Sequence, residues 1–398
     1  MTRRVQSRLR AAVIGAGFVG TQHIEALHRI GVEVAIVATS EPRGARAAAR
    51  SLGAERWTTD WASAATDQGV DVVHVCVPNN LHRDVVLTAL GGNKHVICEK
   101  PLGVDVAESR DLVAAADQGD RVTVLCHNYR FFPMAAELRM RVGAGQLGPV
   151  HAVRGAYLQD WLLSPSATNW RVDAARGGRS RAVADIGSHW VDLAETVSHQ
   201  RATEVIADMS IVFSRRPGRQ RGETFARADS AEEMVEVGTE DQAGLLIRFD
   251  GGAHGTLALS QVAAGHANDF QLAVDGTSGS ASWQQERPDQ LVISSGGSRE
   301  TVSRAPNGLS AGVGRLAQLP AGHNEGWADA LRNLLAAAYE EISGGRDRDA
   351  AAAAPLPTFN DGLRHMAFVE AAMCSAAEGR WVTVDEVLAA GQPMQPVT

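Results

Sequence analysis

Short apolar runs alternate with segments of helical periodicity along the first third of the chain. The apolar runs predict β-strands at AAVIGAG (11–17), VEVAIVA (32–38), DVVHVCVP (71–78), HVICEK (95–100) and RVTVLCH (121–127). The segments between them predict helices at 21–29, 41–53, 82–92 and 105–118. Strands and helices in alternation imply right-handed βαβ units and a parallel sheet covered on both faces. We therefore predict a doubly wound α/β domain.

The pattern changes after Asn128, where strand-like runs follow one another with turn residues between them. These runs lie at 150–159, 204–213, 243–250, 253–262, 270–276 and 280–285. Their succession predicts an α+β domain built on an open, largely antiparallel sheet. The end of the chain predicts helices at 327–342 and 361–379 and a short strand at 381–384. Solvated loops are expected at 214–230 and at about 296–320.

A chain of 398 residues is too long for one ordinary core, so two domains are expected. We place them at 1–127 and 128–398, with the last helices packing back on the first domain. The excess of 46 acidic over 38 basic side chains argues against a nucleic-acid or anionic-membrane partner held by bulk electrostatics. No apolar stretch approaches the roughly 18–20 residues of a membrane span. The basic start MTRRVQSRLR lacks the cleavage pattern of a signal peptide. We expect a soluble, cytoplasmic protein.

Residue types that bind metals are scattered along the sequence. The four cysteines have no metal-ligand spacing, and three fall in or beside strand-like runs; they are Cys76, Cys98, Cys126 and Cys374. The histidines His127, His189 and His199 are also scattered. We expect buried, reduced thiols and no metal site.

The glycine-rich segment 15–20 follows the first predicted strand and precedes a helix. It reads G-x-G-x-x-G, in which Gly15 makes the tight turn, Gly17 admits a pyrophosphate against the backbone, and the third glycine lets helix and strand pack closely. The phosphates would then meet the N–H groups of the helix N-terminus, beside Phe18 and Val19. The alternative is a glycine turn with a structural role only. In its βαβ context the segment predicts a dinucleotide site.

The end of the second strand bears on the choice between NAD and NADP. An acidic residue there binds the ribose hydroxyls and repels a 2′-phosphate. Thr39 or Ser40 falls at this position, with Glu41 slightly later and Arg43 close behind. Hydroxyls with a guanidinium favour a 2′-phosphate, and therefore NADP, whereas Glu41 would favour NAD.

Further motifs connect the chain to a known family. They are the glycine loop, PNNLH (78–82), EKP (99–101), NYRF (128–131), DIGSHWVD (185–192) and the closing GLRHMAFVEAA and GRWVTV. This combination resembles the Gfo/Idh/MocA family of oxidoreductases over nearly the whole chain. The resemblance implies an N-terminal NAD(P)-binding Rossmann domain and a C-terminal domain that binds substrate and forms homodimers or homotetramers. It adds these residues to the cofactor site: Pro78, Asn79, His82, Glu99 and Lys100.

The resemblance also implies a catalytic set of Lys100, Asp185 and His189. Oxidising a secondary alcohol needs a base and a cation that stabilises the developing alkoxide. His189 suits the base, Lys100 suits the alkoxide, and Asp185 can orient substrate or imidazole; whether His189 or Lys100 takes the proton stays open. The alternatives are that Asp185 caps a helix starting at 186 or 187, that His189 packs in a core, and that Lys100 is solvated.

The segment 157–173 is rich in Trp, Gln, Asp, Asn and Arg, which resembles the sugar-oxidising members of the family. The resemblance assigns Tyr129, Gln159 and Arg171 to a sugar, with Trp170 as a stacking face; the alternative is that the tryptophans only pack at a domain junction. For two further residues the sequence leaves two interpretations open. His323 is either a substrate contact or a helix cap, and Asp192 is either near the site or on a helix surface.

These observations predict an NAD(P)-dependent dehydrogenase acting on a secondary hydroxyl of a sugar, anhydrosugar or cyclic polyol. Two alternatives remain open. One is an NAD-dependent glycosidase, in which the cofactor is reduced and reoxidised within one turnover. The other is a cofactor-binding regulator without catalysis, against which the joint presence of Lys100, Asp185 and His189 argues.

Overall fold

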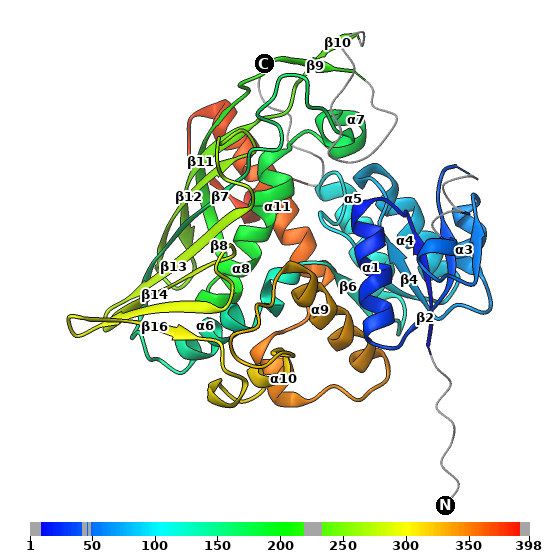
Figure 1. Ribbon diagram of the computed structural model, residues 1–398. Coiled ribbons are helices and arrows are strands. Elements are labelled where there is room, and N and C mark those ends of the chain that lie inside the picture. The colour runs from blue at the N-terminus through cyan, green and yellow to red at the C-terminus, as the bar shows by residue number, and fades with distance from the viewer. Residues whose placement is uncertain (1–8, 42–45, 47–48, 219–232, 391–398) are drawn as a thin grey trace, which may run out of the picture.

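The first domain is built on a parallel sheet. The computed structural model describes residues 9–41, 46, 49–218 and 233–390, and in this part six strands pair in the order β3-β2-β1-β4-β5-β6 (Figure 1). The strands are β1 (Arg10–Ile14), β2 (Glu33–Ala38), β3 (Arg56–Thr58), β4 (Val72–Val75), β5 (His95–Cys98) and β6 (Thr123–Leu125). The helices are α1 (Phe18–Arg29), α3 (Trp61–Thr66), α4 (His82–Gly91) and α5 (Val106–Asp117). The predicted doubly wound domain is confirmed; the short β3 and α3 were not predicted, because β3 carries no apolar run and α3 is only 6 residues long.

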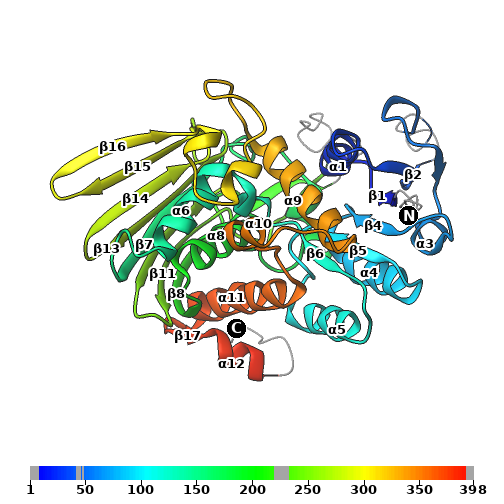
Figure 2. The same ribbon diagram turned by 90° about the horizontal axis from the view of Figure 1, so that it is seen from below.

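The two faces of this sheet are covered by different parts of the chain. Strands such as β1 and β4 are buried on both faces, which explains their nearly continuous apolar sequences. One face packs against α3, α4 and α5. The other face packs against α1 and against α9 (Trp327–Ile342), whose Leu331 and Leu334 share a core with Val13. The C-terminal part therefore helps to build the first domain, and Figure 2 shows α9 beside α1.

The second sheet is mixed and largely antiparallel, as predicted. Nine of the described strands pair in the order β16-β15-β14-β13-β7-β12-β11-β8-β17, and β7 and β12 alone are parallel neighbours. The strands are β7 (Val150–Leu158), β8 (Ala202–Ser210), β11 (Gln242–Phe249), β12 (His254–Ser260), β13 (Asp269–Gly276), β14 (Gly279–Gln284), β15 (Gln290–Ser295), β16 (Ser298–Ser303) and β17 (Val382–Thr383).

Helices cover one face of the second sheet. They are α6 (Pro133–Gly143), α8 (Ser188–Ser198), α11 (Phe359–Glu378) and α12 (Val384–Ala389), and two further short helices are α7 (Ala174–Gly177) and α10 (Arg348–Ala353). Strand β11 alternates exposed and buried positions, so Leu245 and Ile247 face the helices whereas Leu246 is 50% exposed on the other face. Helix α11 contacts both β8 and α5 and so links the two domains. In Figure 1 this helix lies between the large sheet and the first domain.

Both predicted loops contain strands. The segment expected at 296–320 includes β16, an edge strand that pairs with β15. The segment expected at 214–230 begins with β9 (Arg215–Pro217), which pairs with β10 (Met234–Glu236), and residues 219–232 between them lie outside the described part. Arg216 was wrongly expected to be solvated. It is buried, and its guanidinium donates to the carbonyls of Leu162 and Ala167.

No helix in the described part of the chain is long and apolar enough to cross a membrane. Cys98, Cys126 and Cys374 are buried, Cys76 is partly buried, and all four thiols are unpaired.

Candidate active site

Lys100 and Asp185 form an ion pair at the carboxyl edge of the parallel sheet. Lys100 lies two residues after β5, before a cis peptide bond to Pro101. Its Nζ donates to Asp185 Oδ1 at 2.7 Å and to the Asp185 carbonyl at 3.0 Å. The lysine side chain is only 9% exposed, so it is not the solvated lysine of the alternative interpretation. The carboxyl ends of strands are where such sheets place ligands.

Asp185 lies inside a π-helical turn, η4 (Val183–Gly187), which leads into α8. The alternative that Asp185 caps this helix is wrong, because its carboxylate accepts no backbone N–H at the start of α8. It accepts instead from Lys100, from Arg171 Nε at 3.2 Å and from Gln261 Nε2 at 2.9 Å. Turns of this kind occur often at functional sites.

The charges around Asp185 determine its ionisation. Burial by itself would raise its pKa, but Lys100 and Arg171 outweigh burial and hold the pKa well below its usual value. Asp185 is therefore a carboxylate at neutral pH. Its negative charge balances two cations in a site that is largely closed to water.

His189 lies one helical turn further along, at the start of α8, and is 7% exposed. Its Nδ1 is 3.4 Å from Nδ1 of His127, and its ring lies against Tyr129 with 5.0 Å between the centroids. His127 and His189 are thus adjacent, and their description as scattered was wrong, because the segment that follows β6 meets α8 only in the folded chain. Burial, with Lys100 beside it, lowers the pKa of His189 well below its usual value. The ring is neutral and able to accept a proton.

The glycine loop has the geometry that a dinucleotide needs. Gly15 has φ +96°, and a Cβ there would lie 2.3 Å from the carbonyl oxygen of Cys76. A Cβ on Gly20 would lie 1.9 Å from the carbonyl oxygen of Gly15. A Cβ on Gly17, in contrast, would meet no described atom within 4 Å, so this side of the loop is open. No side chain caps the start of α1 and no acidic residue lies in its first turn, where Phe18 is 49% exposed. The loop therefore fits a pyrophosphate.

The other residues of the predicted cofactor site surround the ends of β2, β4 and β5. Thr39 donates its hydroxyl to the carbonyl of Glu41 at 3.0 Å, and Ser40 is exposed. Arg43 lies outside the described residues. Pro78 lies between β4 and the short turn that begins at Asn79.

Three of these residues already have partners within the protein. Asn79 donates to the carbonyl of Gly177 at 2.8 Å. The buried ring of His82 lies within hydrogen-bond distance of the carbonyls of Pro101 and Val77. Glu99 Oε1 is 3.1 Å from His23 Nε2. These bonds hold the strand ends in place around Lys100.

Two of the predicted sugar-binding residues, Tyr129 and Gln159, join one hydrogen-bonded network with partners that the sequence did not indicate. Tyr129 and Tyr157 join their hydroxyls at 2.7 Å, and Tyr157 donates to Asn268 at 2.8 Å. Gln159 donates to the same Asn268 oxygen at 2.8 Å. Burial raises the pKa of Tyr129 to about 12, so this phenol stays protonated. Tyr157 and Asn268 come from β7 and the turn before β13, and no motif marks them.

Arg171 belongs to the ion pair at Asp185. Its guanidinium lies 4.4 Å above the ring of Trp170 and donates to Asp185. Trp170 therefore positions an arginine with one face of its ring. Gln261, which also binds Asp185, was missed because it lies at the end of a strand with no motif around it.

His323 and Asp192 differ in their surroundings. His323 is exposed on the loop before α9, and its carbonyl accepts from Arg304. Asp192 is fully buried, so the alternative of a helix-surface carboxylate is wrong. It accepts from Arg130 Nε at 2.9 Å, and Arg130 also reaches Asp361 at 3.2 Å. The NYRF and DIGSHWVD segments are joined by this ion pair.

Two groups of potential metal ligands come together in the described part of the chain, although none was expected. They are His23, Glu99 and Cys126, and His127, Asp192 and His365, each with ligand atoms within 4.8 Å of one another. In the second group, Arg130 already supplies the positive charge beside Asp192.

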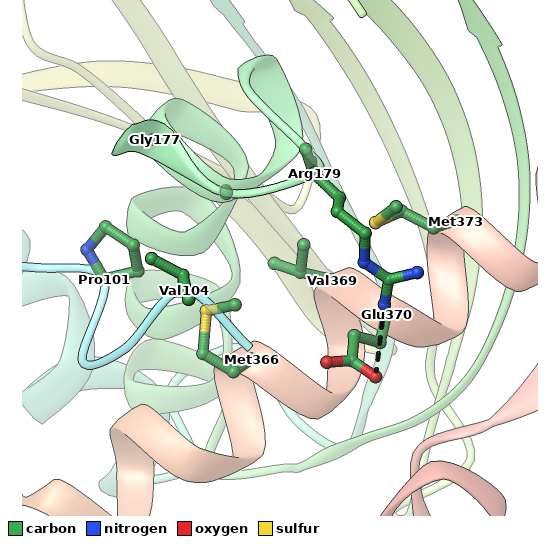
Figure 3. A pocket seen from close by; sticks show the side chains of 10 residues that line it. Pro101, Val104, Gly177, Arg179, Met366, Val369, Glu370 and Met373 are labelled. Carbon is green, nitrogen blue, oxygen red and sulfur yellow. Dashed lines mark ion pairs between the residues drawn. The ribbon is translucent and has the colours of Figure 1, made fainter. Parts of the chain in front are cut away.

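A narrow cavity lies next to Pro101, at the junction of the two domains. Pro101 and Val104 line one side, and Met366 and Val369 of α11 line the other (Figure 3). The Arg179 and Glu370 side chains close one end, with 4.0 Å between their charged atoms. Lys100 is not among the residues that line this cavity.

Comparison with known proteins agrees with this geometry. Residues 9–127 match a family model described as oxidoreductase family, NAD-binding Rossmann fold, and this class of enzyme is what the glycine loop and the ion pair indicate. Residues 135–282 match the C-terminal domain of the same family. The chain belongs to the Gfo/Idh/MocA family and is an NAD-binding oxidoreductase of the sugar and polyol dehydrogenase type.

Several relatives are enzymes with named substrates. Levoglucosan dehydrogenase of Pseudarthrobacter phenanthrenivorans is 29% identical over 96% of this chain and 99% of its own. Myo-inositol 2-dehydrogenase of Thermotoga maritima is 28% identical over 72% of this chain and 78% of its own. The solved structure of levoglucosan dehydrogenase in complex with NADH and L-sorbose superposes with a TM-score of 0.86, at 28% identity over 96% of this chain and 100% of that chain.

Proposed function

We propose that the protein oxidises a secondary hydroxyl of a sugar, anhydrosugar or cyclic polyol and transfers the hydride to a nicotinamide cofactor. The observation that supports this most is the buried Lys100–Asp185 pair, with His189 beside it at the edge of the sheet that carries the glycine loop. The names of relatives that act on levoglucosan and inositol point to the same substrate class.

Each residue has a role that follows from its surroundings. Lys100 holds the substrate oxygen and stabilises the alkoxide charge as the proton leaves. His189 accepts that proton, because its ring is neutral and Nε2 has no hydrogen-bond partner among the described residues. Asp185 positions Lys100, and the bound cofactor accepts the hydride.

The polar network on the second sheet is the proposed sugar site. Tyr129 and Gln159 supply donors and acceptors, Tyr157 and Asn268 complete the network, and Arg171 adds a cation beside Asp185. Paired polar groups of this kind discriminate hydroxyl positions on a sugar, because an unmatched position leaves a buried group without a partner. His323 lies on an exposed loop. We propose it as a substrate contact on the basis of the sequence alone.

For the cofactor, we propose NADP over NAD on the basis of the sequence. The end of β2 carries the hydroxyls of Thr39 and Ser40 where an acidic residue would select NAD. The related solved structures are named with NADH and NAD+, so the preference needs a direct test. Comparing kcat/KM for the two cofactors with one alcohol decides between them.

We also propose that copies associate through the uncovered face of the second sheet as a homodimer or homotetramer. Leu246 is half exposed there, and Ile206 and Ala258 line a shallow hollow beside it. Light scattering should give a multiple of the chain mass, and Leu246→Glu should reduce it. A monomeric parent protein would contradict this proposal.

One experiment tests the function. A panel of anhydrosugars, sugars and inositols is mixed with NAD and with NADP, and reduced nicotinamide is followed by absorbance. A steady increase in this absorbance with at least one polyol supports the proposal. Sugar cleavage without a net increase in absorbance would indicate the glycosidase. Cofactor binding without any turnover would indicate the regulator.

A further inference from the structure

A row of buried histidines continues from the proposed catalytic base toward the far side of the second domain. His189 Nδ1 is 3.4 Å from His127 Nδ1. His127 Nε2 is 3.3 Å from His365 Nδ1. Neighbouring rings are nearly perpendicular, with centroids 5.2 Å and 5.0 Å apart. All three side chains are buried, at 7%, 1% and 2% exposure.

The row ends at two buried carboxylates. His365 Nε2 is buried, and it has no hydrogen-bond partner closer than Glu195 Oε2, at 3.7 Å, and Asp192 Oδ1, at 3.8 Å, among the described residues. Asp192 is held by Arg130. Glu195 accepts from Arg201, whose side chain is 46% exposed. The Glu195 side chain is 4% exposed, and its ion pair links the row to this partly exposed arginine.

His127 and His365 each have one nitrogen toward His189 and the other toward Glu195. A neutral imidazole carries one N–H and one lone pair, so a proton can enter at one nitrogen while another leaves from the opposite one. His127 has both of its nitrogens in contact with another histidine. A histidine that served only to fill space would not need both contacts.

We propose that His189, His127, His365 and Glu195 form a proton relay that carries the alcohol proton out of the closed active site. This inference rests on the proposed function. The hydride goes to the nicotinamide, and the hydroxyl proton bonds to His189 Nε2.

The relay then moves one proton at each step. The His189 Nδ1–H bond breaks as a proton bonds to His127 Nδ1. His127 releases its Nε2 proton to His365 Nδ1, and His365 releases its own Nε2 proton to Glu195. One proton enters and one leaves, and no charge remains in the interior. The reverse sequence supplies the proton for ketone reduction.

Burial and the charged groups around the row keep His127 and His189 neutral between turnovers. Burial lowers the pKa of His127 well below its usual value, and neighbouring rings and cations add to this effect. The charged groups that face the row are Lys100 after β5, Arg130 in the short turn Asn128–Phe131, Arg171, Asp185, Asp192 and Glu195 in or near α8, and Asp361 in α11. A proton on the row is therefore passed on rather than held.

The test replaces His365 by Gln, which can hydrogen-bond but cannot accept and release a proton at two nitrogens. With a polyol from the substrate panel, kcat should fall about tenfold or more while KM changes little. The solvent deuterium isotope effect on kcat should rise, because proton release becomes rate-limiting. Added imidazole should restore turnover in His365→Ala. The control is His199→Asn, at the exposed end of α8, which should change none of these values.

A second measurement needs no substrate and separates this proposal from the proposed function. In protein labelled with ¹⁵N-histidine, the ring nitrogens should show the neutral tautomers that the relay needs: Nδ1–H on His189 and Nε2–H on His127 and His365. Other tautomers would overturn the relay even if a sugar is oxidised, and these tautomers support it even if the panel gives no turnover. An unchanged kcat and isotope effect in His365→Gln would also overturn it.

Discussion

Lys100 Nζ lies 2.7 Å from Asp185 Oδ1 and 3.0 Å from the Asp185 carbonyl oxygen, so the lysine is bound by both the side chain and the backbone of one residue. The two residues come from different domains. The site is therefore assembled only when the domains meet.

Lys100→Ala should lower kcat/KM by about 10²–10³-fold, because the cation beside the developing alkoxide is lost. Cofactor binding, measured by fluorescence titration, should stay near the parent value. The chain has one other lysine, Lys94, which donates to the carbonyl of Val70, and Lys94→Arg is the matched control. Unchanged turnover in Lys100→Ala would refute the assignment.

The pH profile should reflect His189 and not Asp185. Asp185 is ionised throughout the working range, because its pKa is held well below the usual value. His189 must be neutral to accept a proton, and its pKa is lowered below the usual value of about 6.5. Activity should therefore persist below that pH and fall only at more acidic values. A profile of kcat/KM against pH checks this, and an acid limb above the usual histidine pKa would contradict it.

Gly17 and Gly20 of the glycine loop should respond differently when each is replaced by alanine. In Gly17→Ala the new methyl group meets no protein atom, so stability should stay the same while cofactor affinity falls by about tenfold. In Gly20→Ala the methyl group overlaps the Gly15 carbonyl, and the free energy of unfolding should fall by about 1–3 kcal/mol. Urea unfolding and cofactor titration of both variants separate these effects. Equal behaviour of the two variants would show that the open side of Gly17 is not where the cofactor binds.

Asp192→Asn should lower the free energy of unfolding by about 3 kcal/mol, because it leaves the buried Arg130 with an incomplete partner set. The double variant Arg130→Met, Asp192→Leu should recover part of this loss, since no unpaired charge remains there. Chemical denaturation measures both variants. If Asp192→Asn is as stable as the parent protein, Asp361 alone is a sufficient ion-pair partner for Arg130.

A chelator should leave turnover unchanged. The positive charges beside Asp185 and Asp192 come from Lys100 and Arg130, and these occupy the carboxylates that a metal would need. Activity measured after dialysis against EDTA checks this. A strong loss that zinc restores would point to the grouping of His127, Asp192 and His365 as a metal site.

Local patterns predicted most elements of the fold, and the failures have local causes. Helices such as α9 have a clear apolar period, and β11 contains the apolar run 245–247, so both followed from the sequence. The strand β16 carries one apolar residue, Val302, in a polar segment and was therefore expected to be loop. Arg216 was expected in solvent because nothing local marks a buried arginine, and its carbonyl partners lie about 50 residues earlier in the chain.

The sequence by itself determined the glycine loop, the order of strands and helices, and, through the family motifs, the identities of Lys100, Asp185 and His189. These features depend on periodicity and on residues close together along the chain. Only the tertiary structure decided that Asp185 lies in a π-helical turn, that Tyr157 and Asn268 join the polar network, and that His127 and His365 continue from His189. These contacts join residues separated by up to 238 positions, and they exist because both sheets and α11 pack into one body.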